Sequence, residues 1–138
     1  MSKKKKVDAK KYVKFVRQVT SEPSLKTGAL MGRINALDTE TCNVSQLLTA
    51  ALGLSAEAGE FTEIVKKILL QGKPYNESNI EHMKIELGDV LWYIAQACMA
   101  LDVSFYDLME MNVKKLGARY PEGSFDIYHS ENRKEGDR

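Results

Sequence analysis

Two long segments with helical periodicity, separated by one short break, constrain the fold of this chain more than any other feature. Apolar side chains recur every three or four residues from Asn43 to Gln71 and again from Ser78 to about Leu101. Gly72 and Pro74 interrupt the pattern between the two segments. At 1.5 Å per residue, each segment would form a helix on the order of 35 to 45 Å long. A connection this short predicts an antiparallel hairpin of two helices.

Shorter helices are expected before and after the hairpin. One covers Ala9 to Val19 and ends before the Ser-Glu-Pro-Ser stretch at 21–24. The other begins at Ser104 and ends near 117–120. Residues 20–42 give a weaker signal, which predicts a short helical turn without a clear cap. Because only nine Gly and three Pro residues interrupt the chain, we expect an all-α fold.

Polar residues at the predicted helix starts support these boundaries. Asn43 is a favourable N-cap for the first long helix. Ser78, with Glu81 three residues later, has the pattern of a capping box for the second. Ser104 is followed by Asp107 in the first turn of the last helix. Each predicted helix after residue 42 therefore has its own start signal.

Length and composition predict one globular domain. The 138 residues fit a single domain, which we expect to cover 9–126, between a flexible basic tail at 1–8 and a polar tail at 127–138. Hydrophobic residues make up 43% and charged residues 28%, as is typical of a globular protein with a core. The net charge of +1 is far from the basic balance of proteins that bind long nucleic acids. We therefore expect no long nucleic acid as a partner.

Cysteine content and hydropathy predict where in the cell the protein is found. Cys42 and Cys98 are too few for a disulfide scaffold or a structural zinc site, which predicts reduced thiols in a cytoplasmic protein. The longest apolar stretch, 90–101, is interrupted by Gln96 and is shorter than the roughly 20 residues that a membrane span needs. The lysines at 3–6 are not followed by an apolar segment, as they would be in a signal peptide. No membrane partner is expected.

Four acidic residues stand out within the hairpin. Glu57 and Glu60 are three residues apart in the first long helix, and Glu86 and Asp89 are three apart in the second. At this spacing both members of a pair lie on one face of a helix, with Cβ atoms about 5 to 6 Å apart. Because apolar side chains flank the acids on both sides, they are expected in a partly buried seam rather than in open water.

Buried carboxylates must be protonated, paired with a cation or bound to a metal. Four carboxylates with hard oxygen ligands suit Mg²⁺, with Mn²⁺ as a substitute, and Ca²⁺ is also compatible with such ligands. A di-iron bundle is the competing metal site, but it needs Glu-x-x-His on two helices. Here Glu60 and Asp89 stand where the two histidines of that motif would be. His82 shares the stripe of Glu86, but a plain polar residue near a helix start is the simpler interpretation, and we do not include it in the site.

These acids carry a resemblance to a known family. Leu-Ser-Ala-Glu-Ala-Gly-Glu at 54–60, followed by Glu-Leu-Gly-Asp at 86–89, resembles the Glu-x-x-Glu and Glu-x-x-Asp signature of the MazG-like all-α nucleoside triphosphate pyrophosphohydrolases. A third block, from Asn112 to Pro121, is similar to the Asn-x-x-Lys-Leu-x-x-Arg-Tyr-Pro end of that family's last helix. The resemblance covers roughly residues 43–126. It departs at Ala56, where some relatives have a further glutamate.

The resemblance implies an activity and a cellular setting. The blocks at 49–51 and 64–67 are similar to single-domain, phage-type members, which implies the host cytoplasm as the place of action if a phage encodes the chain. The implied reaction is hydrolysis of a nucleoside or deoxynucleoside triphosphate to the monophosphate and pyrophosphate by metal-activated water. Glu57, Glu60, Glu86 and Asp89 would be the metal ligands, and Glu57 or Glu60 would also be catalytic by orienting or deprotonating the water. Spacing does not decide between these two.

Further residues are candidates for binding the nucleotide. Lys115 and Arg119 follow Asn112 on one face of the last helix and would hold the triphosphate, although basic residues also occur at helix C-termini for electrostatic reasons alone. Asn112 and Tyr120 would donate hydrogen bonds. Tyr93 matches an aromatic residue that lies beside the site in relatives, although it is also suited to the core. Lys67 is a further phosphate candidate, with an equally good interpretation as the partner of Glu63.

The amount of apolar surface predicts an oligomer. Both long helices have apolar arcs on two sides, which the short first and last helices of one chain cannot cover. Two hairpins that pack as a four-helix bundle would bury this surface, and the resemblance likewise implies a homodimer or homotetramer. The alternative function is a helical dimerisation module that binds or senses a nucleotide without hydrolysing it.

Overall fold

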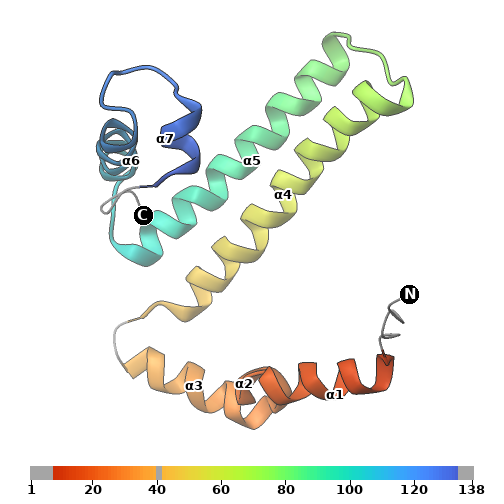
Figure 1. Cartoon of the computed structure of the whole chain (residues 1–138), viewed down its shortest axis with the longest axis vertical. Helices are drawn as coiled ribbons and strands as arrows, with labels where there is room; N and C mark the ends of the chain where they lie inside the picture. The colour runs from red at the N-terminus through yellow and green to blue at the C-terminus, as the bar shows by residue number, and fades with distance from the viewer. Residues whose placement is uncertain (1–7, 40–41, 134–138) are drawn as a thin grey trace, which may run out of the picture. The chain divides into compact units, whose positions relative to one another are not determined.

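The computed structural model describes residues 8–39 and 42–133, and every regular element in these ranges is a helix (Figure 1). The predicted all-α fold is therefore confirmed. The basic run at 3–6 lies outside the described residues. The helices are α1 (Ala9–Val19), α2 (Glu22–Leu25), α3 (Thr27–Thr39), α4 (Val44–Gln71), α5 (Glu77–Leu101), α6 (Phe105–Arg119) and α7 (Ile127–Glu131).

The chain divides into two compact units, Met1–Val44 and Ser45–Arg138. In the first unit, α1 has the predicted bounds, and its N-cap Asp8 accepts hydrogen bonds from the backbone N–H groups of Lys10 and Lys11. The short turn expected within 20–42 is an underestimate, because α2 and the 13-residue α3 both form there. The apolar residues of α3 do not gather on one face, so the segment lacks the periodicity by which a helix is recognised.

In the second unit, α4 and α5 form the predicted antiparallel hairpin and lie side by side along their length (Figure 1). Helix α4 ends at Gln71, where Gly72 takes the left-handed conformation with φ of 73°, as expected of a glycine that stops a helix. The amide Nε2 of Gln46 donates to Oε1 of Gln96 across the two helices, at 3.0 Å. This hydrogen bond shows that the start of α4 faces the end of α5, as an antiparallel arrangement requires.

The expected capping box at Ser78 and Glu81 is wrong. Helix α5 begins earlier, at Glu77, and its N-cap is Asn76, whose side chain accepts a hydrogen bond from the backbone N–H of Asn79 at 3.0 Å. Asn79 is itself buried, and its Nδ2 donates to the carbonyl oxygen of Pro74 at 2.7 Å. The asparagine pair ties the hairpin loop to the first turn of α5, so capping is complete before Ser78 is reached.

The capping box of α6 forms as the sequence suggests. Ser104 Oγ accepts from the backbone N–H of Asp107, and Asp107 Oδ2 accepts in return from the backbone N–H of Ser104, at 3.1 and 2.8 Å. The hydroxyl of Ser104 also donates to Oδ2 of Asp107, at 2.7 Å, and this bond, followed by the one from the backbone N–H of Ser104, holds the pKa of Asp107 below its usual value. Within the expected polar tail, the residues Ile127–Glu131 form the short helix α7.

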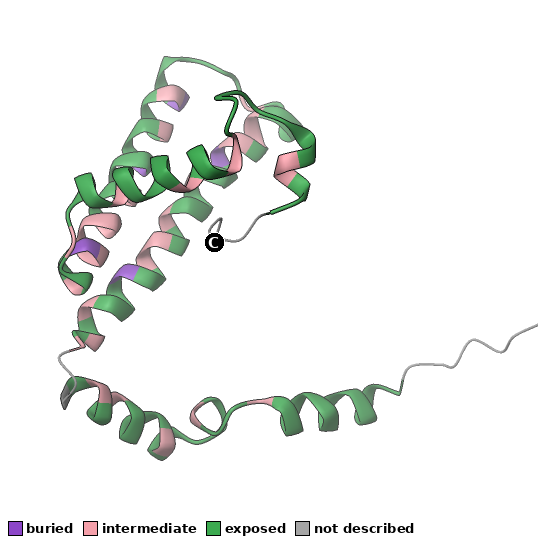
Figure 2. Cartoon of the chain, turned by 60° about the vertical axis from the view of Figure 1, so that its left-hand side comes forward, coloured by how far each residue is buried: buried purple, intermediate pink, exposed green. Residues whose placement is uncertain are grey.

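The hairpin keeps much apolar surface open. Among the described residues, the buried apolar side chains are those of Ala50, Ile64 and Cys98, and Figure 2 shows how few and scattered the buried positions are. The larger exposed apolar residues of the hairpin are Leu47, Leu48, Leu52, Leu69, Leu70, Ile85, Leu87, Leu91, Trp92, Met99 and Leu101. No described helix combines the length and the apolar character needed to cross a bilayer.

Candidate functional site

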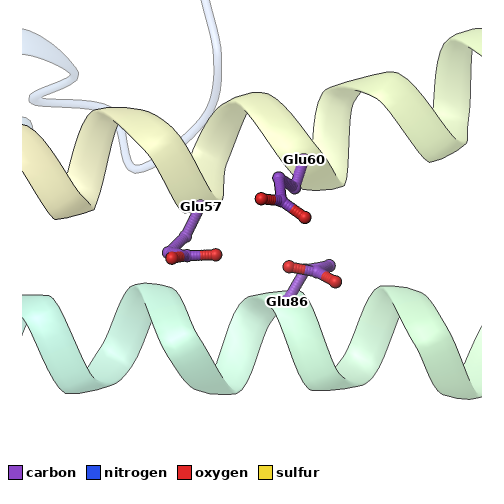
Figure 3. Close-up of side chains that lie close together, drawn as sticks. All are labelled: Glu57, Glu60 and Glu86. Atoms are coloured by element: carbon purple, nitrogen blue, oxygen red, sulfur yellow. The ribbon is translucent and has the colours of Figure 1, made fainter.

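Three of the four predicted acidic residues converge between the two helices of the hairpin. Glu57 and Glu60 from α4 and Glu86 from α5 each offer one carboxylate oxygen, and these oxygens lie within 4.8 Å of one another (Figure 3). We call these three residues the acidic cluster. The antiparallel packing of α4 on α5 brings the predicted pairs together, because residues one turn apart on each helix face the same seam.

The members of the acidic cluster differ strongly in burial. Glu86 is 5% exposed, Glu57 is half-buried, and Glu60 is exposed. Glu86 therefore belongs to the interior of the hairpin, whereas Glu60 is accessible to water. Hard oxygen donors with uncompensated negative charge are the donor set that Mg²⁺, Mn²⁺ or Ca²⁺ prefers, so the residues present fit a divalent cation.

The pKa of Glu57 reflects the close approach of the other acidic residues. Its pKa is raised above the usual glutamate value, first by desolvation and then by the negative charges of Glu60, Asp89 and Glu86. A hydrogen bond with the carboxyl group of Glu86 raises the pKa of Glu57 further. The neighbouring negative charges therefore disfavour the ionised form of Glu57, and a divalent cation would relieve the same repulsion.

This raised pKa gives a prediction for stability. The folded protein binds a proton at Glu57 more tightly than the unfolded chain does, so protonation of Glu57 favours folding. Without divalent cations, this contribution should be complete below the ordinary glutamate pKa and be lost as the pH rises through the raised pKa of folded Glu57. Urea unfolding in EDTA over a pH series measures this contribution to the free energy of unfolding. Glu57→Gln should not lose stability over this pH range. If its free energy of unfolding depends on pH as that of the wild type does, Glu57 is not the group responsible.

Asp89 lies next to the acidic cluster rather than within it. It is exposed on α5, three residues after Glu86, and is not one of the three residues whose oxygens converge. Its charge nevertheless raises the pKa of Glu57, which shows that Asp89 acts electrostatically on that carboxyl group. The fourth predicted ligand is thus near the others without sharing their close oxygen contacts.

His82 is a residue of this region that the sequence interpretation left out. Its Nε2 lies 2.9 Å from Oε1 of Glu86, one helical turn further along α5. The spacing of four residues was the available signal, since side chains at i and i+4 are neighbours on a helix. A polar residue near a helix start has many simpler explanations, so spacing alone did not single out this histidine.

Tyr93 is held against α4 close to the acidic cluster. Its ring lies so near the backbone of Gly53 that a Cβ atom at position 53 would overlap with the ring carbons. The ring of Trp92 contacts it edge to face, with ring centroids 4.8 Å apart. Because Gly53 is one turn before Glu57, this contact lies one turn from the acidic cluster, and a role of Tyr93 beside the nucleotide stays a prediction.

Lys67 has the salt bridge that was its alternative interpretation. Its Nζ lies 3.2 Å from Oε1 of Glu63, and both side chains are about half exposed. The hydrogen bond and charge of Lys67 are the leading causes that hold the pKa of Glu63 below its usual value. Glu63 therefore pairs with a lysine on its own helix, and a phosphate role of Lys67 stays a prediction.

The other predicted nucleotide-binding residues belong to α6 and its C-cap. Lys115 and Arg119 are half-buried, and Asn112 is exposed. Tyr120 is the C-cap of α6, its backbone N–H donates to the carbonyl of Leu116, and its ring packs against Phe125 with centroids 5.8 Å apart. Both rings line an apolar pocket with Val113, Leu116 and Gly117. The structure thus places these four residues on a separate element from the acidic cluster.

Comparison with known proteins identifies the domain that contains these features. The family model of the MazG nucleotide pyrophosphohydrolase domain matches residues 45–124, which include α5, α6 and all of α4 except its first residue. The Gene 37 protein of Mycobacterium phage L5 is 37% identical over 82 residues, which are 59% of this chain and 72% of that protein. No solved structure matches the chain significantly. With more than half of its residues in the matched domain, this chain belongs to the MazG nucleotide pyrophosphohydrolase family.

Proposed function

We propose that the protein hydrolyses nucleoside or deoxynucleoside triphosphates to the monophosphate and pyrophosphate with Mg²⁺ as cofactor. The observation that carries the proposal is the convergence of Glu57, Glu60 and Glu86 inside the MazG domain. Water breaks the anhydride bond between the α and β phosphates. The nucleoside monophosphate keeps the α phosphate, and the β and γ phosphates leave as pyrophosphate. No serine or cysteine nucleophile is required for such a reaction.

The acidic residues have distinct tasks in this proposal. Glu57, Glu60, Glu86 and Asp89 would hold Mg²⁺, or Mn²⁺ in its place. When bound, the cation would neutralise negative charge on the phosphate oxygens and make water a better nucleophile near neutral pH. Glu57 or Glu60 would orient the attacking water and accept its proton, since both face the open side of the cluster more than the buried Glu86 does.

The remaining candidates would bind the nucleotide. Lys115 and Arg119 would neutralise the phosphate chain, because a guanidinium binds two phosphate oxygens at once and an ammonium provides a compact positive charge. Asn112 and Tyr120 would donate hydrogen bonds, and Tyr93 would border the site with its ring. Lys67 would exchange Glu63 for a phosphate oxygen, which its half-exposed position allows.

The protein would act as a homodimer or homotetramer. The support is the exposed apolar surface of the hairpin, on which Leu52, Leu91 and Trp92 are each more than half exposed in the single chain. Apolar surface of this extent is typical of an interface between protein chains. Light scattering at micromolar concentration should give at least twice the 15.5 kDa of one chain. The mass of a single chain would contradict the oligomer.

A panel of nucleotides tests the function. Ribonucleoside and deoxyribonucleoside triphosphates, with modified nucleotides included, are incubated with the protein and Mg²⁺, and pyrophosphate release is measured. At least one triphosphate should be turned over, and Asp89→Ala should lower the rate. Nucleotide binding without turnover by the wild type would favour a nucleotide-sensing module instead, and unchanged turnover of Asp89→Ala would contradict the assigned metal site.

A further inference from the structure

Glu86 is the member of the acidic cluster whose orientation matters most. Its side chain is 7% exposed, so water can do little to hold its oxygens in place or to replace a missing hydrogen bond. A glutamate carboxylate also turns easily about its last side-chain torsion, because that torsion has no sharp preferred angles. A cation ligand of this kind needs a hydrogen-bond partner that fixes the plane of the carboxylate.

His82 is in the position to supply that hydrogen bond. Its Nε2 lies 2.9 Å from Oε1 of Glu86, a distance typical of a hydrogen bond to a charged acceptor. The imidazole donates from Nε2 both as the cation and as the neutral tautomer that has its proton there. The side chain of His82 is 50% exposed, so the imidazole is in contact with water while its partner Glu86 is not.

We propose that His82 is a positioning residue for the metal centre: by a hydrogen bond to Oε1 it holds the carboxylate of Glu86 in the orientation that a cation would need. This inference rests on the metal centre of the proposed function. Histidine is not itself a ligand in this arrangement, because the converging oxygens belong to Glu57, Glu60 and Glu86 and because hard cations prefer oxygen. Groups that orient a metal ligand typically affect metal affinity or activity by about 10 to 100-fold.

A purely structural role would have a different outcome. If His82 only stabilised the helix, its loss would lower the melting temperature and leave metal binding unchanged, because the loss of a helical ion pair does not by itself change metal binding elsewhere. The chain offers a matched control on the same helix, where Lys84 Nζ lies 3.1 Å from Oε2 of Glu81 and both side chains are more than half exposed. Lys84→Ala removes a pair of similar length without touching the acidic cluster.

The test compares Mn²⁺ binding to wild type, His82→Ala, His82→Gln and Lys84→Ala by calorimetry without nucleotide, together with thermal unfolding of the same proteins. We expect His82→Ala to raise the Kd for Mn²⁺ by about tenfold or more and to lower the melting temperature more than Lys84→Ala does, because it leaves the buried Glu86 without its partner. His82→Gln, whose amide still reaches Glu86, should recover most of the affinity, and Lys84→Ala should bind as the wild type does.

The outcomes separate this inference from the proposed function. If His82→Ala binds Mn²⁺ as tightly as the wild type, or if Lys84→Ala loses as much affinity as His82→Ala, His82 is not a positioning residue. A glutamine variant as weak as the alanine variant would equally overturn the role of the hydrogen bond. If the wild type binds Mn²⁺ but releases no pyrophosphate from any nucleotide, the proposed reaction fails while the role of His82 is still judged by the titration.

Discussion

Replacing Glu60 with glutamine should abolish most of the hydrolytic activity and, in the absence of divalent cations, make the fold more stable. Glu60 is exposed, so the substitution leaves no buried group unpaired. It removes a cation ligand and one of two candidates for the catalytic base, and loss of a positioned acid or base typically lowers kcat by about 10² to 10⁴-fold. It also removes the strongest charge repulsion that acts on Glu57, and the pKa of Glu57 should therefore fall towards its usual value.

Opposite changes in activity and stability distinguish a metal centre from a structural cluster. The measurements are kcat with saturating Mg²⁺ and the urea midpoint in EDTA. Glu81→Gln is the control, because Glu81 is an exposed glutamate of α5 whose partner is Lys84. It should retain wild-type activity. Retention of more than about a tenth of wild-type kcat by Glu60→Gln would show that Glu60 has no essential role, since the expected loss is at least about 10²-fold.

The second large effect concerns the packing of α4 on α5. Gly53→Ala would place a Cβ atom in overlap with the ring of Tyr93, so either the ring or the helices must move. Overpacking of this kind typically costs about 1 to 3 kcal/mol, although alanine is the better helix former. We expect a lower free energy of unfolding in urea and a loss of activity, because Glu57 lies one turn from the site of the clash.

Gly59→Ala is the matched control for this prediction. Gly59 lies on the same helix, and a Cβ atom built there meets nothing within 4 Å. Without a clash, the change should stabilise the protein by about 0.5 to 1 kcal/mol through helix propensity. Adding Tyr93→Ala to Gly53→Ala should recover part of the lost stability. If Gly53→Ala and Gly59→Ala have the same effect, the close approach of Tyr93 to α4 does not exist in solution.

The sequence predicted the hairpin because its signals are local and repeated. Apolar periodicity over 43–71 and 78–101, with Gly72 as the stop, defines two long helices. Because the loop between them is short, they pack antiparallel. The convergence of Glu57, Glu60 and Glu86 was predictable because residues three apart lie on the same face of a helix. The capping box at Ser104 and Asp107 was predictable for the same reason, because a cap involves only neighbours in sequence.

Other features depend on contacts that periodicity does not encode. Helix α5 starts at Glu77 with Asn76 as its N-cap, and Asn79 binds the loop carbonyl of Pro74, a contact that requires the loop conformation. His82 has the right spacing from Glu86, yet only the burial of Glu86 shows that the pair differs from an ordinary surface pair. Helix α3 has no apolar face, so its sequence lacks the pattern that marked α4 and α5.

Product analysis tests the central claim most directly. Phosphorus NMR follows a triphosphate substrate, chosen from the nucleotide panel, during incubation with the protein and Mg²⁺. The proposed function predicts that the nucleoside monophosphate and pyrophosphate appear in equal amounts, that EDTA stops the reaction, and that Glu60→Gln shows little turnover. Formation of the nucleoside diphosphate and orthophosphate, or turnover that continues unchanged in EDTA, would contradict it.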